Sequence, residues 1–406
     1  MKRIIVLLFL LITTLCNSQI RIHGKVLDQQ STPLVGASVY LNNTTIGVST
    51  KSDGSFEFFT SKGTFELIVS YLGYKTVNYN LNTDELKQPL TFKLVENQNI
   101  LDEVVIRKTI YNDRWKSNLK VFKENFLGRT KLAGKANILN PKTLHFEFDL
   151  STETLTAFAR EPLKIEHKGL GYLITFDLVH FSLDRYKLSY LGYTKFENLK
   201  SSQRNLRRWK KNRKKAYLGS KRHFIKSLID KTTTQDGFTI HQFRREKNKD
   251  RPTDKEINTA RKLARLYPIK DLKLSKKITT PKTALDSIIF VLQKSNAPRF
   301  KDYLYKKNIA PSSLITTTND RILLSFENYL SVIYSKEKEE NNYVQGPFGI
   351  TRKPLKVQTS YITMLSKVIP IDISGIITNP LSVHVEGYWA YEQFADALPL
   401  NYTLKE

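Results

Sequence analysis

Cysteine is almost absent from this sequence, which has only Cys16 among its 406 residues. Cys16 lies just after an apolar stretch near the amino terminus, so cleavage beyond it would leave a mature chain without a thiol. We therefore expect no disulfide bond, no cysteine-ligated metal and no cysteine nucleophile in the mature protein.

The sequence also lacks the motifs of several enzyme classes. It contains no H-E-x-x-H, no G-x-S-x-G and no phosphate-binding G-x-x-x-x-G-K, and none of its seven histidines is followed three residues later by Glu. A zinc carboxypeptidase needs such His and Glu ligands. We expect no metal and no cofactor, and name no catalytic residue among the 38 acidic side chains.

Long apolar runs are missing except for Ile4–Leu15, which two basic residues precede. Twelve helical residues span about 18 Å, well short of a bilayer core. A basic start, a short apolar stretch and small residues up to Ser18 predict a secretory signal peptide at residues 1–18. We favour cleavage after Ser18 over a lipid anchor at Cys16, because Leu15 stands where a lipidation signal has a small residue.

Acidic residues are too few to balance the basic ones, and the formal net charge is +27. Residues 20–96 hold seven Lys/Arg and seven Asp/Glu, and two cations precede them, so residues 97–406 carry +25. This change in charge predicts a domain boundary near residue 100 and an anionic partner for the later part.

Short apolar segments with turn residues between them fill residues 20–96. Alternation and turn chemistry predict seven strands, as expected for a β-sandwich. The predicted strands are Ile20–Val26, Val35–Leu41, Thr45–Thr50, Ser55–Thr60, Thr64–Tyr71, Tyr74–Leu81 and Leu90–Val95.

Four motifs in this region, Gly24–Val26, Pro33–Val39, Ser52–Phe56 and Val69–Lys75, resemble those of the carboxypeptidase regulatory-like domain. The resemblance implies a prealbumin-like sandwich of the kind common in cell-envelope proteins of the Bacteroidota. It also implies an appended module for scaffolding or recognition, without a peptidase site.

A predicted linker at residues 97–110 contains Leu101, Asp102, Glu103, Val104 and Val105. This run is similar to the segment that follows the same module in TonB-dependent outer-membrane receptors, where it can add a strand to an energising partner. We prefer a plain linker strand, because no series of barrel-type strands follows.

Residues 111–406 alternate between helical and strand periodicity, so the whole chain is expected to be α+β, with a prealbumin- or Ig-like sandwich before a mixed antiparallel-sheet and helix portion. A division of this portion near residues 247–257 is an open alternative. Expected elements are a helix at Asp113–Leu127, a sheet over Thr143–Glu197, helices at Gln203–Tyr217, from Ser220 to Ile229, Thr253–Leu266, Thr283–Gln293 and Trp389–Leu398, and strands at Gly237–Phe243, Ile322–Tyr334 and Leu381–Tyr388. Turns are expected at Gly169, Gly171 and Gly192, an exposed loop at Arg244–Pro252 and a polar connection at Ser335–Asn342.

A basic block between Arg204 and Lys226 contains eleven Lys/Arg and no acid. We predict that its helices bind anionic lipid, lipopolysaccharide or an acidic glycan, with Trp209 and Tyr217 at the boundary. The alternative is a solvated helix that favours solubility. The candidate binding residues are Arg207, Arg208, Lys210, Lys211, Arg213, Lys214, Lys215, Lys221 and Arg222.

Two weaker candidates are considered. His145, Glu147 and Asp149 share one face of a predicted strand and could ligate a metal or transfer protons, but a solvated strand face is the preferred interpretation. The aromatic run Gly387–Tyr391 could stack on sugar rings, yet its spacing favours core packing.

These observations predict a non-catalytic exported protein of the periplasm or outer membrane. It would bind or scaffold an anionic envelope component through its basic surface, or assist an outer-membrane transport system, with no nucleic acid as partner. The alternative is a hydrolase acting on an envelope polymer through carboxylates that the sequence does not identify.

Overall fold

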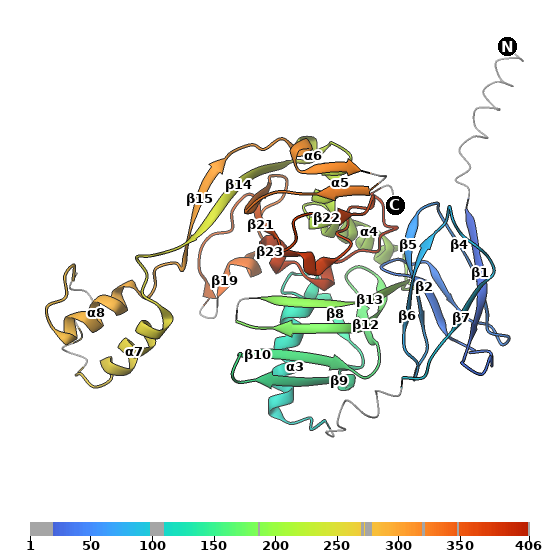
Figure 1. Ribbon diagram of the computed structural model, residues 1–406, viewed down its shortest axis with the longest axis horizontal. Helices are drawn as coiled ribbons and strands as arrows, with labels where there is room; N and C mark the ends of the chain where they lie inside the picture. The colour runs from blue at the N-terminus through green and yellow to red at the C-terminus, as the bar shows by residue number, and fades with distance from the viewer. Residues whose placement is uncertain are drawn as a thin grey trace, which may run out of the picture.

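The computed structural model describes residues 19–97, 109–185, 187–268, 272, 278–318, 321–346 and 349–404 (Figure 1). These residues form mixed sheets and helices, 24% helix and 38% strand, which confirms the α+β class. The predicted signal peptide, Cys16 and the segment Leu101–Val105 lie outside the described residues.

The amino-terminal module is a two-sheet sandwich, as predicted. One sheet has the order β4-β1-β7 and the other β3-β2-β5-β6. Alternating residues such as Ile22, Val39 and Phe56 point between the sheets and are buried there. The strands are β1 Ile20–Leu27, β2 Ser38–Leu41, β3 Gly47–Ser49, β4 Ser55–Thr60, β5 Thr64–Ser70, β6 Val77–Asn82 and β7 Leu90–Lys93.

Helix α3 (Asp113–Phe126) follows and covers one face of an antiparallel sheet, confirming the predicted helix and the sheet over Thr143–Glu197. Strand β12 is the centre: β13 pairs along one side of it, while β11 and β10 pair with its two ends on the other. The strands are β8 Ala136–Ile138, β9 Leu144–Asp149, β10 Thr154–Ala159, β11 Leu163–His167, β12 Tyr172–Leu183 and β13 Leu188–Asn198.

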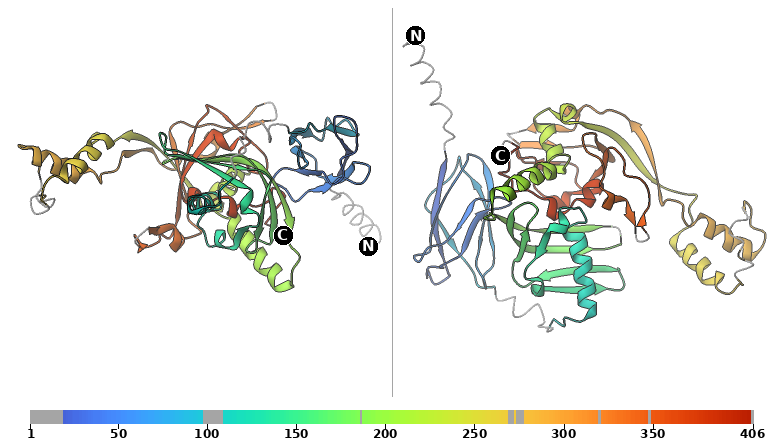
Figure 2. Two further views of the ribbon diagram at one scale, coloured as in Figure 1. Left: turned by 90° about the horizontal axis from the view of Figure 1, so that it is seen from below. Right: turned by 180° about the vertical axis from the view of Figure 1, so that it is seen from behind.

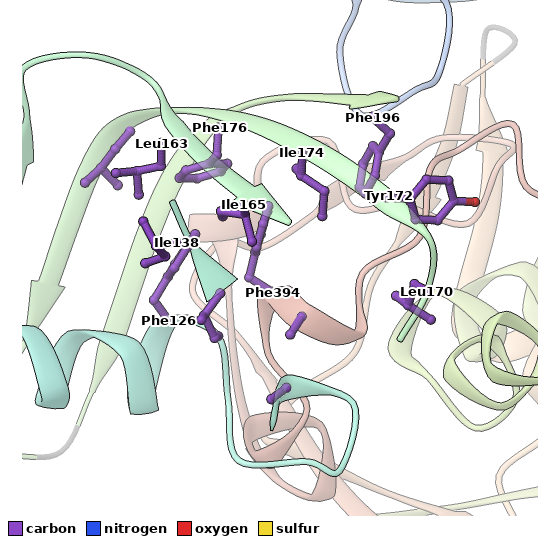
Figure 3. Close-up of a cluster of buried hydrophobic side chains, with 14 of the residues drawn as sticks. Phe126, Ile138, Leu163, Ile165, Leu170, Tyr172, Ile174, Phe176, Phe196 and Phe394 are labelled. Atoms are coloured by element: carbon purple, nitrogen blue, oxygen red, sulfur yellow. The ribbon is translucent and has the colours of Figure 1, made fainter. Parts of the chain in front are cut away.

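Figure 3 shows the core between α3 and this sheet, where Phe126 lies against Phe176 and Phe394. The ring centroids of Phe126 and Phe394 are 4.7 Å apart, and those of Phe126 and Phe176 are 5.0 Å apart. Because Phe394 is near the carboxyl terminus, this core joins the last segment of the chain to the first sheet after the module.

One expected turn in this sheet is absent. The sequence suggested a turn at Gly192, but Gly192 lies inside β13, opposite Leu178. A Cβ there would be 2.4 Å from the Asp177 carbonyl oxygen and 2.4 Å from Phe176 Cζ, so the glycine allows β12 and β13 to approach closely. Strand β10 is a further element that the alternation did not reveal.

The second large sheet has the order β15-β14-β18-β21-β23, and helix α5 packs on it. Its strands are β14 Phe238–Lys247, β15 Phe300–Lys306, β18 Tyr329–Tyr334, β21 Gln358–Met364 and β23 Val383–Gly387. The adjoining helices are α4 Gln203–Tyr217, α5 Lys221–Ile229 and α6 Thr233–Asp236. Small sheets are formed by β16 Ile315–Thr318, β17 Arg321–Leu324 and β22 Ile369–Ile371, and by β19 Gln345–Gly346 and β20 Gly349–Ile350.

Three expected elements in this part are wrong in extent. Arg244–Lys247 was expected in a loop but extends β14, because it pairs with β15. Ile322–Tyr334 is two strands of different sheets, separated by a turn with Asn328 at φ 58°. Trp389–Leu398 is not one helix: α9 (Tyr388–Tyr391) ends where Glu392 turns extended to bridge Gly128, and a short 3₁₀ helix covers Phe394–Asp396.

An inserted helical hairpin separates β14 from β15. It consists of α7 (Asp254–Ala264) and α8 (Ala284–Lys294), close to the two helices that the sequence predicts. In Figures 1 and 2 the hairpin stands away from the rest of the molecule at the end of a two-stranded ribbon.

The module docks on the sheet of α3 through backbone pairing. Thr44, in the turn between β2 and β3, forms a parallel bridge with Lys195 of β13. The Asn43 amide donates to the Thr194 carbonyl at 2.7 Å, and the Thr194 amide donates to Asn42 Oδ1 at 2.8 Å. These bonds cover part of the outer edge of β13.

Candidate functional site

The basic helix α4 matches its predicted bounds and is held by the turn between β11 and β12. Trp209 Nε1 donates to the Lys168 carbonyl at 2.8 Å, and Asn212 Nδ2 donates to the Gly169 carbonyl at 2.8 Å. Arg213 Nε donates to the Leu170 carbonyl at 2.8 Å. One face of α4 thus satisfies three successive carbonyls of a tight turn, which fixes the helix on the sheet.

The contact between Gly171 and Trp209 brings α4 very close to this turn. Gly171 has φ 78°, and a Cβ there would lie 2.2 Å from the Trp209 ring. Trp209 is 4% exposed. The sequence placed Trp209 at the edge of a binding surface, but its ring is packed against the turn and is not available to a ligand.

The opposite face of α4 consists of exposed cations. At 100° per residue the basic side chains cover an arc of about 160°. In the described part of the chain, Arg207, Arg208, Lys210, Lys211 and Lys214 form no ion pair. The structure brings together five of the nine predicted binding residues on one solvent-facing surface, which we name the α4 cationic face. The helix is visible on the near side in the right-hand view of Figure 2.

The other predicted binding residues hold the fold together. The Arg213 guanidinium lies 4.0 Å from the centre of the Tyr172 ring. Arg222, on α5, donates to the carbonyls of Pro399 and Leu400 at 2.8 and 2.6 Å. Burial lowers the pKa of Lys221. These contacts hold Arg213 and Arg222 against the rest of the molecule, and Lys221 belongs to α5, outside the α4 cationic face.

The last predicted residue, Lys215, reaches from the end of α4 into a cluster of carboxylates. Lys215 Nζ lies 2.6 Å from Glu340 Oε1. Glu340 also accepts from the Lys131 amide at 3.0 Å and from the Tyr391 hydroxyl at 3.0 Å. A small cavity beside this ion pair is lined by the carboxylate residues Glu337, Glu340, Glu392 and Asp396.

The environment pushes the pKa values of these carboxyls apart. Burial, strengthened by the neighbouring acids, raises the pKa of Glu392 well above its ordinary value. Burial also raises the pKa of Asp396 to about 7, against the hydrogen bond that Thr130 donates. Burial has the same effect on Glu340, but its hydrogen bonds from Lys215 and Lys131 outweigh it and lower the pKa. The cluster therefore pairs proton-retaining acids with one ionised carboxylate.

Such a pair of acids resembles the chemistry of a glycoside hydrolase, but the space beside it is small. The cavity has a volume of about 10 Å³, enough for one water molecule. Its wall includes Gln358, which is 3% exposed and whose Oε1 has no hydrogen-bond partner. The arrangement can hold protons and a water molecule, and no sugar ring fits in it.

A larger hollow of about 490 Å³ lies next to β15. Its floor is apolar, with Ile309, Leu314 and Phe326, and Glu327 is the acidic residue at its rim. Hydrolysis of a glycosidic or peptide bond by paired carboxylates needs two acids on opposite sides of the bond. Among the residues that line this hollow, Glu327 is the single acid.

The weaker candidates do not assemble into sites. His145 Nε2 lies 3.6 Å from Glu147 Oε1, but Asp149 turns away to accept from the Ser151 amide at 2.8 Å. Across the described residues, no three His, Cys, Asp or Glu side chains are grouped so as to hold a metal ion. The aromatic run is core, as predicted: Trp389 is 5% exposed and donates to the Gly219 carbonyl at 2.8 Å.

Sequence reasoning missed the carboxylate cluster. Its members come from a segment predicted to be a polar connection (Ser335–Asn342) and from the expected closing helix (Trp389–Leu398). The run Glu337-Lys338-Glu339-Glu340 was the one sequence feature that could have indicated the cluster. Acidic residues in a connecting segment are not always solvated, because ion pairs with basic residues allow them to be buried. Glu339 is 3% exposed and is paired with Arg352 at 2.6 Å.

Comparison with known proteins identifies the family of the amino-terminal module. A search of the curated proteins found none that matches this sequence. A family model does match residues 22–106, which include the described sandwich from Ile22, the third residue of β1, onwards, and the remainder of the chain has no family match. The amino-terminal module is therefore a CarboxypepD_reg-like domain.

Proposed function

We propose that this protein is a non-catalytic component of the cell envelope that binds anionic groups through the α4 cationic face. Lipid phosphates, whether of phospholipid or of lipopolysaccharide, are the ligands that this surface suits best. The single observation that carries the proposal is the presence of five exposed cations on one helix face without ion pairs in the described structure.

This face works against the stability of its own helix. Several pairs of these cations, such as Arg207 with Lys211 and Lys210 with Lys214, lie three or four residues apart, and each such pair opposes helix formation by about 0.2–0.5 kcal/mol. Solubility alone would be achieved with mixed charges, so a binding role explains the pattern better.

The geometry gives less support to a hydrolase. The perturbed acids Glu392 and Asp396 adjoin a space for one water molecule, and the larger hollow carries a single acidic side chain. The cations are exposed on a helix face, whereas the acids adjoin a cavity too small for a polymer. Together these two features favour binding over cleavage of a polymer.

Export and partnership with a transport system also belong to the proposal. They depend on the signal-like residues 1–18 and on the partner segment Leu101–Val105, which lie outside the described residues. None of the helices that the structure describes has the length and hydrophobicity needed to cross a bilayer.

The test uses two variants that remove equal charge. One replaces Arg207, Arg208, Lys211 and Lys214 by Gln. The control replaces Lys51, Lys75, Lys87 and Lys93, which are exposed on the sandwich and unpaired there, by Gln. We expect co-sedimentation with phosphatidylglycerol vesicles at low salt to fall at least tenfold for the α4 variant, since each cation contributes about 1 kcal/mol near an anionic membrane.

The control should bind nearly as well as the unmodified protein. Repeating the assay with lipopolysaccharide distinguishes the two sources of phosphate. Equal binding by both charge variants, or no binding of the unmodified protein to either ligand at low salt, would contradict the proposal.

A further inference from the structure

The helical hairpin α7–α8 is carried on a ribbon that leaves the second large sheet. β14 pairs with β18 only as far as Phe243, and beyond that point its partner is β15 alone. The outer ribbon, Arg244–Lys247 with Phe300–Tyr303, is therefore two strands wide. Figures 1 and 2 show α7 and α8 at its end, apart from every other element.

A polar network joins the hairpin to the ribbon. Asn248 is 4% exposed, its amide donates to the Arg299 carbonyl at 2.8 Å, and its Nδ2 donates to the Pro298 carbonyl at 2.8 Å. Asp254 pairs with Arg251 at 3.0 Å and with Arg299 at 2.6 Å. The buried Asn248 and the partly exposed ion pairs of Asp254 together fix the direction of the hairpin relative to the ribbon.

The acids in the described part of the hairpin take part in local contacts. Residues 254–268 and 278–294 contain six Lys/Arg and three Asp/Glu. Asp254 pairs with two arginines, while Glu256 and Asp286 complete the capping boxes that begin α7 and α8. The excess positive charge of these described residues is therefore not neutralised by acids among them.

Exposed leucines lie among the cations at the end of α7. Leu263 is 42% and Leu266 is 77% exposed, and the Leu266 amide donates to the Leu263 carbonyl at 3.0 Å. A spacing of three with this bond places both side chains on the same side. Lys262 and Arg265 adjoin these leucines in the chain, are exposed and form no ion pair in the described structure.

Exposed leucines next to exposed cations favour an anionic bilayer over a soluble polyanion as the partner. A soluble polyanion would neutralise the cations but leave both leucines in water. An anionic bilayer satisfies both, because phosphates lie at the surface and the acyl boundary accepts apolar side chains just below it. We propose that the carboxyl end of α7, which we call the hairpin tip, docks on an anionic lipid bilayer, with Leu263 and Leu266 entering the interface and Lys262 and Arg265 contacting lipid phosphates.

The hairpin tip and the α4 cationic face are separate surfaces, so each proposal can fail without the other. The first measurement attaches an environment-sensitive fluorophore to Leu266→Cys in the full chain with Cys16→Ser, so that the label has one site. The matched control is Leu150→Cys, because Leu150 is 80% exposed at the end of β9, on a different element.

We expect the label at position 266 to brighten and shift to shorter wavelength on vesicles that contain phosphatidylglycerol, with no change on phosphatidylcholine alone. The label at position 150 should not respond. A silent label at position 266 on vesicles that sediment with the protein would overturn this inference and leave binding through α4 intact.

The second measurement compares Leu263→Ser/Leu266→Ser with Leu150→Ser. Loss of the two apolar side chains should lower vesicle partitioning about tenfold, whereas the control should bind unchanged. The double variant should bind soluble polyphosphate normally. An equal loss of polyphosphate and vesicle binding would indicate a polyanion site instead of a bilayer, and unchanged vesicle binding would also overturn the inference.

Both labelled and serine variants retain the buried residues Ala260, Ala264 and Ile288 that join α7 to α8. Their helix content, measured by circular dichroism, should match that of the unmodified protein. If the glutamine variant of α4 still gives the position 266 response, the hairpin contact stands on its own.

Discussion

The Phe196 amide donates to the Thr44 carbonyl at 3.0 Å. The turn between β2 and β3 of the amino-terminal module therefore pairs with β13, which follows it by more than a hundred residues in the chain. Leu400, near the other end of the chain, donates its amide to the Asn43 carbonyl at 2.7 Å. The same short turn thus receives both the sheet edge and the carboxyl-terminal segment. A docked module of this kind orients its surfaces relative to α4, which a flexible tether would not.

We predict that Asn42→Ala loosens this docking. Asn42 Oδ1 is the acceptor for the buried Thr194 amide, and its removal leaves that donor without a partner, at a cost of about 1–3 kcal/mol. Urea unfolding should show this loss, and hydrogen exchange at residues 194–196 should accelerate. Asn78→Ala is the control, because it removes only an exposed bond of 3.4 Å to Glu66; equal exchange in both variants would contradict the prediction.

Arg222→Lys should destabilise the protein by about 2–4 kcal/mol. The guanidinium donates to carbonyls of Ser374, Pro399 and Leu400, and a lysine ammonium cannot reproduce that planar set of donors. Arg208→Lys, on the α4 cationic face, should change the free energy of unfolding by less than about 0.5 kcal/mol. Chemical denaturation of the two variants checks the contrast, and similar values would mean that Arg222 does not hold the carboxyl-terminal segment.

The contrast between Arg208 and Arg222 marks the limit of sequence analysis for the site. Periodicity and charge predicted α4 with its bounds, and the stop at Gly219 and the cap at Ser220 predicted α5, because these signals are local. Whether a cation faces solvent or a distant carbonyl depends on tertiary packing. Nothing in the sequence around Arg222 indicated that its side chain would donate to the carbonyls of Pro399 and Leu400.

The same distinction applies to the fold. The seven sandwich strands were predictable, because turn residues bound them and strands such as β1 and β4 alternate between a buried and a more exposed face. Gly192 was misjudged, because a glycine that permits two strands to approach looks in sequence like a glycine that ends one. The carboxylate cluster escaped notice, because Glu340 and Asp396 meet only after the chain has folded.

Asp396→Asn should change how stability depends on pH. In the folded protein the pKa of Asp396 is raised to about 7, against an ordinary value of 3.8. Between these values the folded state keeps a proton that the unfolded state releases, so this group's contribution is present at low pH and is lost as the pH rises through 7. The asparagine variant cannot titrate there, and it should gain stability relative to the unmodified protein from pH 5 to pH 8.

Urea unfolding of both proteins across this range gives the difference directly. The buried His167, whose pKa burial lowers to about 4, titrates in both proteins and cancels in the comparison. Asp149→Asn serves as control: hydrogen bonds from Ser151 lower the pKa of Asp149, so that variant should be less stable than the unmodified protein by a constant amount from pH 5 to pH 8, and the difference should shrink only as the pH falls below about 4. A pH-independent difference for Asp396→Asn would show that this carboxyl ionises normally.

Gly171→Ala should displace α4 from the sheet. Alanine at φ 78° is strained by about 1–2 kcal/mol, and its Cβ would also overlap the Trp209 ring at 2.2 Å. Because neither the turn nor the buried ring has room to move, we expect a total loss of at least about 3 kcal/mol. Gly134→Ala is the control, since a Cβ there meets nothing within 4 Å.

A double variant separates the two causes. In a Trp209→Ala background the overlap disappears, so Gly171→Ala should cost only the backbone strain of about 1–2 kcal/mol. Denaturation of the single and double variants measures this coupling, and near-ultraviolet circular dichroism reports whether Trp209 has left its packed position. If the losses in free energy of unfolding are additive, Gly171 is needed only for the backbone conformation of the turn. A coupling of more than about 1 kcal/mol would show that Gly171 is also needed for the close packing of α4, through Trp209, on that turn.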